Sequence, residues 1–428
     1  MHVYLEGERG NFPHTNLPNP FRYTLAVESV DTISIVSEQD SVAFVVAPTD
    51  SMTFDVVRQQ GQDTLHCFFT ITEKQEHVRF SEAYIRAHRG KTFVEIPPVY
   101  ELINVVYALT PTGRENEYTV RKSTPYYQKV LTYFDAYQQE PIVSTVDSLL
   151  KADQYHLLKM DAYAFTMDQE GTIQESEVYN VVSWEEVNTL QPYLSSLQAF
   201  ARKSDFLTFY NAHRSLYQQQ IKTYQDTINT DEMKAWLERN FPSTRYDAIK
   251  IIFSPLVGGN QSSNHFENNG FRELQAHVNY PYMADWYREQ SPQVATLVRG
   301  NIVFTELNHG YINPESEKRK YNRQVDRALR NIDDWIDRKK PAGGYANPYA
   351  CFNEYMNWGL VSLRYLDYAP PDHQSWLRAG VENMMSNRRG FKRFAEFNRF
   401  LVDLYQDRTS DQVLADLYPQ IIRWFSEQ

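Results

Sequence analysis

The stretch from Asn301 to Pro314, NIVFTELNHGYINP, decides how the second half of the chain is interpreted. In many zinc-dependent hydrolases one helix carries His-Glu-x-x-His, because ligands at i and i+4 lie one turn apart and the Glu reaches the metal-bound water. Glu306 and His309 stand in this register, while Thr305 stands where the first histidine would be. The stretch therefore predicts a helix with a degenerate metal site, in which His309 is the remaining histidine ligand.

The surrounding residues indicate the extent of this helix and a candidate third ligand. Gly310 and Pro314 predict that the helix is short, because both residue types favour helix ends. A second helix is predicted over residues 349–366 and carries Glu354. In gluzincins, a class of zinc peptidases, the third ligand is a glutamate on a helix downstream of the motif helix. Glu354 is therefore the candidate third ligand, and Glu306 is the candidate general base.

Each assignment has a plainer alternative. Glu306 could be an exposed helix carboxylate, and Glu354 could pair with Arg364. Tyr311 and Tyr355 are candidate contacts for a substrate or a tetrahedral oxyanion, because a hydroxyl near the metal has this role in zincins. With 30 tyrosines in the chain, neither tyrosine assignment is specific.

Two histidines are the nearest replacements for the missing ligand. His265 lies in an Asn-rich segment, and His277 lies on a predicted strand. We interpret His265 as a solvated loop residue and His277 as a half-buried strand residue that is hydrogen-bonded to a neighbour. Neither has a spacing that predicts a ligand.

Four stretches together resemble an uncharacterised bacterial family of gluzincin-like proteins, a domain of unknown function. They are VEIPPVYEL (94–102), residues 126–134, SPLVGG (254–259) and the segment from Glu306 onward, and the similarity covers most of residues 90–370. In that family the last segment holds a complete His-Glu-x-x-His, a short hydrophobic stretch and Asn-Pro. The resemblance implies a zincin fold, a metallopeptidase reaction class and an extracytoplasmic location, periplasmic or at the cell surface. The N-terminal residues of this sequence show no signal peptide.

The departure from the family pattern is Thr305, and it affects the expected affinity for zinc. A neutral hydroxyl is a poor zinc ligand, and a catalytic site needs three protein ligands plus one open position. Removing a group that only supports a ligand lowers metal affinity by roughly 10- to 100-fold, so loss of a ligand itself costs at least about that much. We therefore expect zinc to bind weakly at most.

Three functions remain open from the sequence. The favoured one is a metallopeptidase-like pseudoenzyme with a degenerate zinc site, which no longer hydrolyses peptides and binds a peptide or protein in the old cleft. The second is an active metal-dependent peptidase, in which Glu306 activates water and a non-standard ligand set holds the metal. The third is a non-enzymatic surface or scaffold module, which an exposed aromatic patch on the N-terminal domain would favour.

The sequence predicts an α+β fold with two domains. Short β-branched and aromatic runs separated by turn residues occupy the first part of the chain, at 32–36, 41–46, 52–57 and 64–71. Helical periodicity dominates later. We therefore expect a β-rich domain over residues 1–122 and a mainly helical, gluzincin-like domain over residues 123–428.

A small sheet is expected within the helical domain. Its predicted strands are 246–253 and 271–280, which are rich in β-branched residues or bounded by turn residues. Helices are expected at 315–337, 349–366, 374–386, 390–406 and 411–426.

Composition excludes several classes of partner and site. A net charge of −11 would repel phosphate backbones, so nucleic acid is not an expected partner. The longest apolar runs, such as residues 42–47, are far shorter than the roughly 20 residues that cross a bilayer, so no membrane span is expected. Two cysteines exclude a disulfide framework and a cysteine-rich metal site. Nothing in the sequence indicates the oligomeric state.

Overall fold

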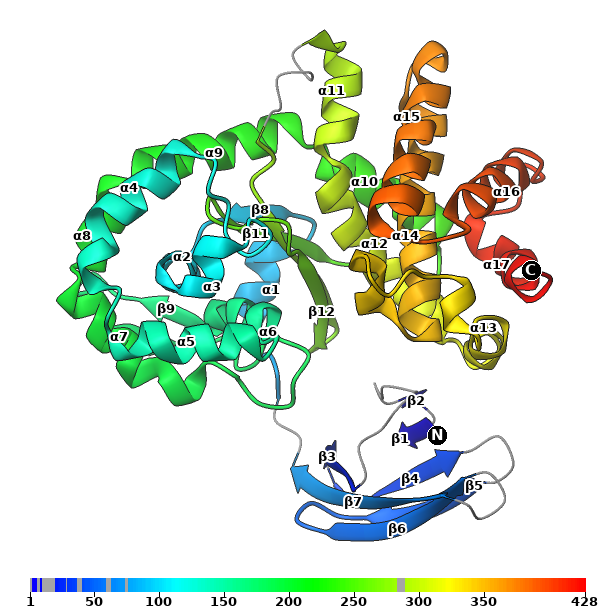
Figure 1. Cartoon of the computed structure of the whole chain (residues 1–428), viewed down its shortest axis with the longest axis horizontal. Helices are drawn as coiled ribbons and strands as arrows, with labels where there is room; N and C mark the ends of the chain where they lie inside the picture. The colour runs from blue at the N-terminus through cyan, green and yellow to red at the C-terminus, as the bar shows by residue number, and fades with distance from the viewer. Residues whose placement is uncertain are drawn as a thin grey trace. The chain divides into compact units, whose positions relative to one another are not determined.

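The computed structural model describes residues 2–5, 8–9, 20–27, 29–36, 41–58, 63–73, 76–282 and 289–428 (Figure 1). They form two compact units, Met1–Glu76 and His77–Gln428, and each unit has its own hydrophobic core. Strands dominate the first unit and helices the second, which confirms the predicted α+β class. Among the described residues, no helix is long and apolar enough to cross a bilayer.

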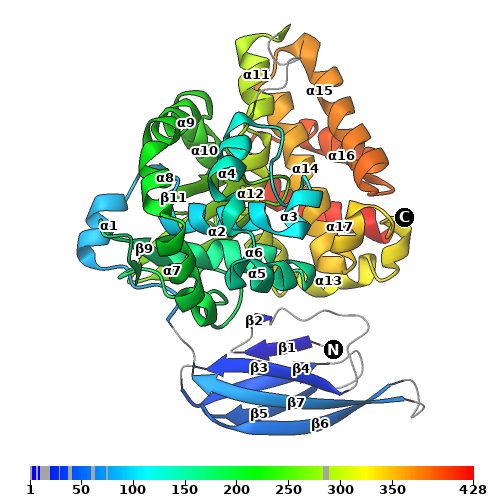
Figure 2. The ribbon, with the colours of Figure 1, turned by 60° about the vertical axis from the view of Figure 1, so that its left-hand side comes forward.

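The first unit is built from two sheets that share one core (Figure 2). One sheet has the order β2-β1-β4-β5, and the other has the order β3-β7-β6 with β3 parallel to β7. Ile33 of the first sheet and Phe69 of the second are both buried in this core. All four strands predicted here are confirmed. The strands are β1 (His2–Leu5), β2 (Glu8–Arg9), β3 (Phe21–Val27), β4 (Asp31–Val36), β5 (Ser41–Val46), β6 (Ser51–Arg58) and β7 (Asp63–Glu73).

The boundary between the units falls after Glu76, whereas the sequence placed it after residue 122. The intervening segment holds helices α1 (Glu82–His88), α2 (Pro98–Leu109) and α3 (Pro111–Glu115), and its strand β8 (Thr92–Glu95) pairs with a strand of the second unit. The reason for the difference is α2, whose residues are buried on every side. Such a helix has no polar face, so its sequence lacks the periodicity that identifies a helix.

A four-stranded sheet with the order β12-β13-β11-β8 forms the centre of the second unit. Strand β11 (Ala248–Ser254) runs parallel to β13 (Phe271–Asn279) and to β8, which confirms both predicted strands. Strand β12 (Ser262–Asn268) is an antiparallel edge strand. His265 therefore lies in a strand, and the loop interpretation was wrong. The polar sequence of β12 reflects its partly exposed position at the edge.

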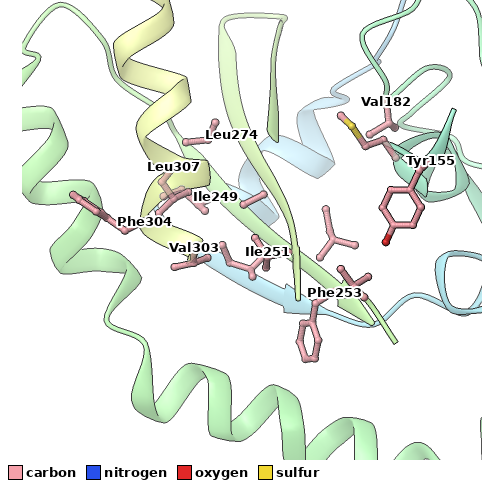
Figure 3. Packing of buried hydrophobic residues seen from close by; sticks show 14 of the residues in the cluster. Tyr155, Val182, Ile249, Ile251, Phe253, Leu274, Val303, Phe304 and Leu307 are labelled. Carbon is pink, nitrogen blue, oxygen red and sulfur yellow. The ribbon is translucent and has the colours of Figure 1, made fainter. Parts of the chain in front are cut away.

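Helices cover both faces of this sheet. Successive residues of a strand point to opposite faces. On one face Leu274 lies so close to Gly310 of α12 (Asn301–Glu317) that a Cβ there would meet its Cδ1 at 2.7 Å. On the other face His277 lies against Tyr100 of α2, with ring centroids 5.7 Å apart. Figure 3 shows Val303 and Leu307 of α12 beside the strands, with Tyr155 of α6 (Tyr155–Asp161) on the other side.

The remaining elements surround this three-layer centre. Long helix α14 (Pro348–Tyr368) packs on α12. The others are α4 (Pro125–Phe134), α5 (Pro141–Lys151), β9 (Phe165–Met167), β10 (Ile173–Glu175), α7 (Leu194–Lys203), α8 (Phe206–Ala212), α9 (Arg214–Thr227), α10 (Thr230–Asn240), α11 (Pro292–Arg299), α13 (Asn322–Ala328), α15 (Pro371–Asn383), a π-helical segment (Met384–Arg389), α16 (Phe394–Gln406) and α17 (Tyr418–Ser426). The predicted helix over 315–337 was wrong, because the end of α12, α13 and a 3₁₀ turn (Ile332–Asp334) occupy this range.

Helix α12 does not end at Gly310 or Pro314, as the sequence predicted, but continues to Glu317. Proline lacks an N–H, so the carbonyl four residues earlier, that of Gly310, loses its helical donor. The hydroxyl of Tyr246 donates to this carbonyl at 2.7 Å. A residue distant in sequence therefore satisfies the acceptor that Pro314 leaves free, and the helix can continue.

We predict that Tyr246→Phe lowers the free energy of unfolding by about 1–3 kcal/mol, because it leaves the buried Gly310 carbonyl without a donor. The control is Tyr311→Phe. Tyr311 packs 5.3 Å from Tyr246, ring to ring, but its buried hydroxyl has no hydrogen-bond partner among the described residues. Urea denaturation should show little change for the control. Equal losses in both variants would contradict the role given to the Tyr246 hydroxyl.

Candidate functional site

Helix α12 carries the degenerate motif on the side that faces α14. Thr305 is buried, and its hydroxyl donates to the carbonyl of Ile302 at 2.7 Å. This is a local bond within the same helix, of the kind that Ser and Thr side chains commonly make. The Thr305 hydroxyl, which stands at the first ligand position, is therefore already hydrogen-bonded to the backbone of its own helix.

His309 is held through both ring nitrogens. Its Nε2 lies 3.1 Å from Nδ2 of Asn357, and its Nδ1 lies 3.4 Å from Oδ1 of Asn313. Asn357 is oriented in turn because its Oδ1 accepts from Nδ2 of Asn308 at 3.2 Å. An amide nitrogen only donates, so in the neutral form of the ring Nε2 accepts this hydrogen bond and Nδ1 carries the proton. The lone pair that would bind a metal is thus hydrogen-bonded to Asn357.

Glu354 lies on α14, almost fully buried, and its carboxylate is surrounded by donors. Its Oε1 accepts from Arg389 and, at 3.0 Å, from Trp358, while Oε2 accepts from Asn357 at 3.4 Å. Burial alone would raise the pKa of Glu354, but Arg389 and His309 outweigh burial and hold this pKa below its ordinary value. Glu354 is therefore ionised and neutralised by Arg389.

The predicted alternative partner of Glu354 was Arg364, which instead pairs with Glu232 at 3.2 Å. Arg389 is the last residue of the π-helical segment Met384–Arg389, and its guanidinium carbon lies 5.3 Å from the ring of Tyr345 and 5.8 Å from that of Trp358. Aromatic rings attract a desolvated cation. Arg389 is thus held in place by the rings as well as by the carboxylate.

Glu306 lies beside this network with only 8% of its surface exposed. Burial raises the pKa of Glu306 to about 7. The negative charge of Glu354 acts in the same direction, whereas His309, Lys159 and Arg389 act against it. Glu306 is therefore a carboxyl group that changes protonation near neutral pH, unlike Glu354.

These residues do not fit a catalytic zinc ion. His309 Nε2 and Glu354 Oε2 lie 3.9 Å apart, but Thr305 supplies no third ligand. In the part of the chain that the structure describes, no group of three or more His, Cys, Asp or Glu residues could hold a metal ion. His277 faces the opposite side of the sheet, against α2, and so does not replace the missing ligand.

Tyr311 and Tyr355 pack in the core and contribute no group to this network. Tyr311 packs against Phe241 and Tyr246. The Tyr355 hydroxyl donates to the carbonyl of Trp335 at 3.0 Å, and its ring lies within a cluster of aromatic residues that includes Phe391. Sequence reasoning placed Glu306, His309 and Glu354 together, and the structure brings these three side chains to one place.

The sequence did not identify the residues that surround His309 and Glu354, of which Asn357 and Arg389 matter most. Asn357 follows Glu354 by three positions, which places both on one face of α14, so the spacing offered a usable signal. Arg389 comes from a segment that follows α15, and no sequence pattern connects it with Glu354. No known family model, curated protein or solved structure matches this chain. The family resemblance therefore rests on the sequence motifs alone.

We predict that Glu306→Gln is more stable than the wild type above pH 7 by about 1–3 kcal/mol and differs little at pH 4.5. The pKa of Glu306 rises on folding from its ordinary value of 4.5 to about 7. Between these values the folded chain binds a proton that the unfolded chain has released, so the wild type loses stability as pH rises through this window.

Urea denaturation at pH 4.5 and pH 8 checks this prediction, with the exposed Glu170→Gln as the control. A difference between Glu306→Gln and the wild type that is the same at both pH values would show that the burial argument is wrong.

Proposed function

We propose that this chain is a metallopeptidase-like protein that has lost catalysis and binds an extended peptide. The observation that carries the first part is the state of Glu354. A glutamate that ligates zinc must direct a free carboxylate oxygen at the metal. Here Arg389, Trp358 and Asn357 already donate to the Glu354 carboxylate.

Arg389 opposes metal binding in two ways: it already binds the carboxylate of Glu354, and its positive charge repels a metal ion. A dication bound between His309 and Glu354 would lie close to a guanidinium that is itself mostly buried, and like charges repel strongly where water is excluded. Zinc would also have to replace the hydrogen bond from Asn357 to His309 Nε2. The arrangement is consistent with a site in which a permanent side-chain cation has taken the place of the metal.

The peptide part of the proposal rests on the edge strand β12. The carbonyl of Ser263 accepts a hydrogen bond from Trp184 Nε1 at 2.9 Å. The Trp184 side chain stands 50% exposed. Peptides commonly bind by adding a strand to such an edge. A main-chain N–H of the peptide would replace the indole N–H, and the displaced Trp184 ring would provide an apolar contact.

One observation favours an active peptidase as the second candidate. Glu306 has the protonation behaviour that a general base or acid needs, and it lies next to His309. The third candidate, a scaffold module, has less support. Its expected feature was an aromatic patch, but the large apolar side chains that stand exposed among the described residues of the first unit are valines, namely Val30, Val42, Val45 and Val57.

Zinc affinity distinguishes the first two candidates. By calorimetry on the metal-stripped chain, we expect the wild type to bind zinc no more tightly than His309→Ala. Thr305→His combined with Arg389→Gln should bind at least about 100-fold more tightly, because it restores a ligand and frees Glu354. Submicromolar binding by the wild type that His309→Ala abolishes would contradict the proposal and support an active metal site.

Peptide binding is tested separately with a library of labelled seven-residue peptides and fluorescence anisotropy. For the best binder, N-methylation at alternate backbone positions should weaken binding at least tenfold, because it removes the N–H groups that pair with β12. Trp184→Phe, which frees the Ser263 carbonyl and keeps a ring, should bind as well as or better than the wild type. The peptide proposal fails if no library member binds or if N-methylation has no effect.

A further inference from the structure

Lys159 of α6 is a fully buried lysine without a carboxylate partner. Its side chain has no exposed surface, and its Nζ donates to the carbonyls of Asn260 at 2.8 Å and of His277 at 3.5 Å. No carboxylate among the described residues is in ion-pair contact with it. Burying an unpaired ammonium costs several kcal/mol, so a charged lysine in this position requires a negative partner.

Lys250 of β11 shows how the same fold treats another buried lysine. Its Nζ lies 3.5 Å from Oε1 of Glu95 and donates to the hydroxyl of Tyr163 at 2.8 Å. Tyr163 donates in turn to Glu95 at 3.2 Å. Lys250 therefore has a carboxylate and a hydroxyl, whereas Lys159 has only two carbonyl groups.

Other buried polar groups near Lys159 also lack partners. His277 is completely buried, and neither of its ring nitrogens has a hydrogen bond within the described ranges, which corrects the expected half-buried, bonded histidine. The same is true of the hydroxyls of Ser262, Tyr100 and Tyr155. Buried polar groups are nearly always bonded to protein, water or a ligand. Several unbonded groups in one region therefore indicate that something polar binds there.

These groups belong to one region of the molecule. Ser262 is the cross-strand neighbour of His277 in the β12–β13 ladder, so the two side chains share a face of the sheet. The ring of Tyr100 lies 5.7 Å from that of His277, and Lys159 Nζ lies 5.0 Å from the ring of Tyr155. This face is covered by α2 and α6, and the inference does not depend on the proposed function.

The chemistry of the group favours an anion. The ammonium has a third proton, the three hydroxyls can each donate, and a neutral imidazole has one N–H. A water molecule could bond to several of these groups but would leave the ammonium charge uncompensated. Because the surrounding side chains are buried, the anion that we infer is a small one.

We propose that Lys159, His277, Ser262, Tyr100 and Tyr155 form a buried binding site for a small monovalent anion such as chloride. The protein environment alone disfavours the charged lysine. Burial lowers the pKa of Lys159 to about 7, and Glu306 opposes this only in part. A bound anion would restore the charged form, so the ion and the lysine charge stabilise each other.

The first test is the stability of the full chain in sodium chloride and sodium bromide against sodium gluconate at equal ionic strength. Binding to the folded state alone raises the melting temperature in a saturable way. We expect this halide-dependent rise in the wild type, its loss in Lys159→Met, and its retention in Lys250→Met. The latter variant removes a second buried lysine, one that already has a carboxylate.

A direct test does not depend on a folded variant. Crystals of the wild type grown in sodium bromide should show an anomalous bromide peak within hydrogen-bond distance of Lys159 Nζ. A wild type with neither a saturable halide effect nor this peak would show that the region holds water only, and the proposal would be overturned. Loss of the halide effect in Lys250→Met as well as in Lys159→Met would overturn it too, because the effect would then not belong to this site.

Discussion

The parallel pairing of β11 with β13 is the constraint on which the second unit depends. Both strands are buried on both faces. Because successive residues point to opposite faces, alternate residues of each strand pack against different layers of the unit. On one face Leu274 meets α12 and brings the degenerate motif against the sheet. On the other face Glu273, Gln275 and His277 are buried polar residues. Glu273 accepts from Tyr84 of α1 and from Gln275, and His277 lies against Tyr100 of α2. The alternation along β13 thus places Leu274 and His277 on opposite faces of the sheet, while Glu306 and Lys159 remain close enough to influence each other's pKa.

The network around Glu354 is built on a buried charge pair between helix α14 and a segment that follows α15. Glu354 lies on α14, which packs on α12, and its Oε2 lies 3.9 Å from Nε2 of His309. The positive charge comes from Arg389, which reaches Glu354 from a segment after α15. Because a guanidinium is charged at every physiological pH, the neutralisation of Glu354 is permanent.

The sequence was most informative where structure depends on local pattern. The β-branched and aromatic runs at β4 through β7 and the β-branched residues of β11 identified those strands, and the spacing of Glu306 and His309 placed them on one helix. It was least informative where a distant residue decides the outcome. The continuation of α12 past Pro314 depends on Tyr246, and the state of Glu354 depends on Arg389. The predicted boundary between the two units lay too far along the chain because α2 went unrecognised. This helix is buried on all sides and lacks the polar face by which a helix is identified from sequence.

The position of Asn357 has a consequence for proton movement. Its amide nitrogen lies between the imidazole of His309 and the carboxylate of Glu354, at 3.1 and 3.4 Å. A side-chain amide donates hydrogen bonds but does not exchange its protons with such groups at ordinary pH. Asn357 therefore insulates the two titratable groups from each other. The hydrogen bonds of Asn357 therefore hold the histidine and the glutamate together but do not carry a proton from one to the other.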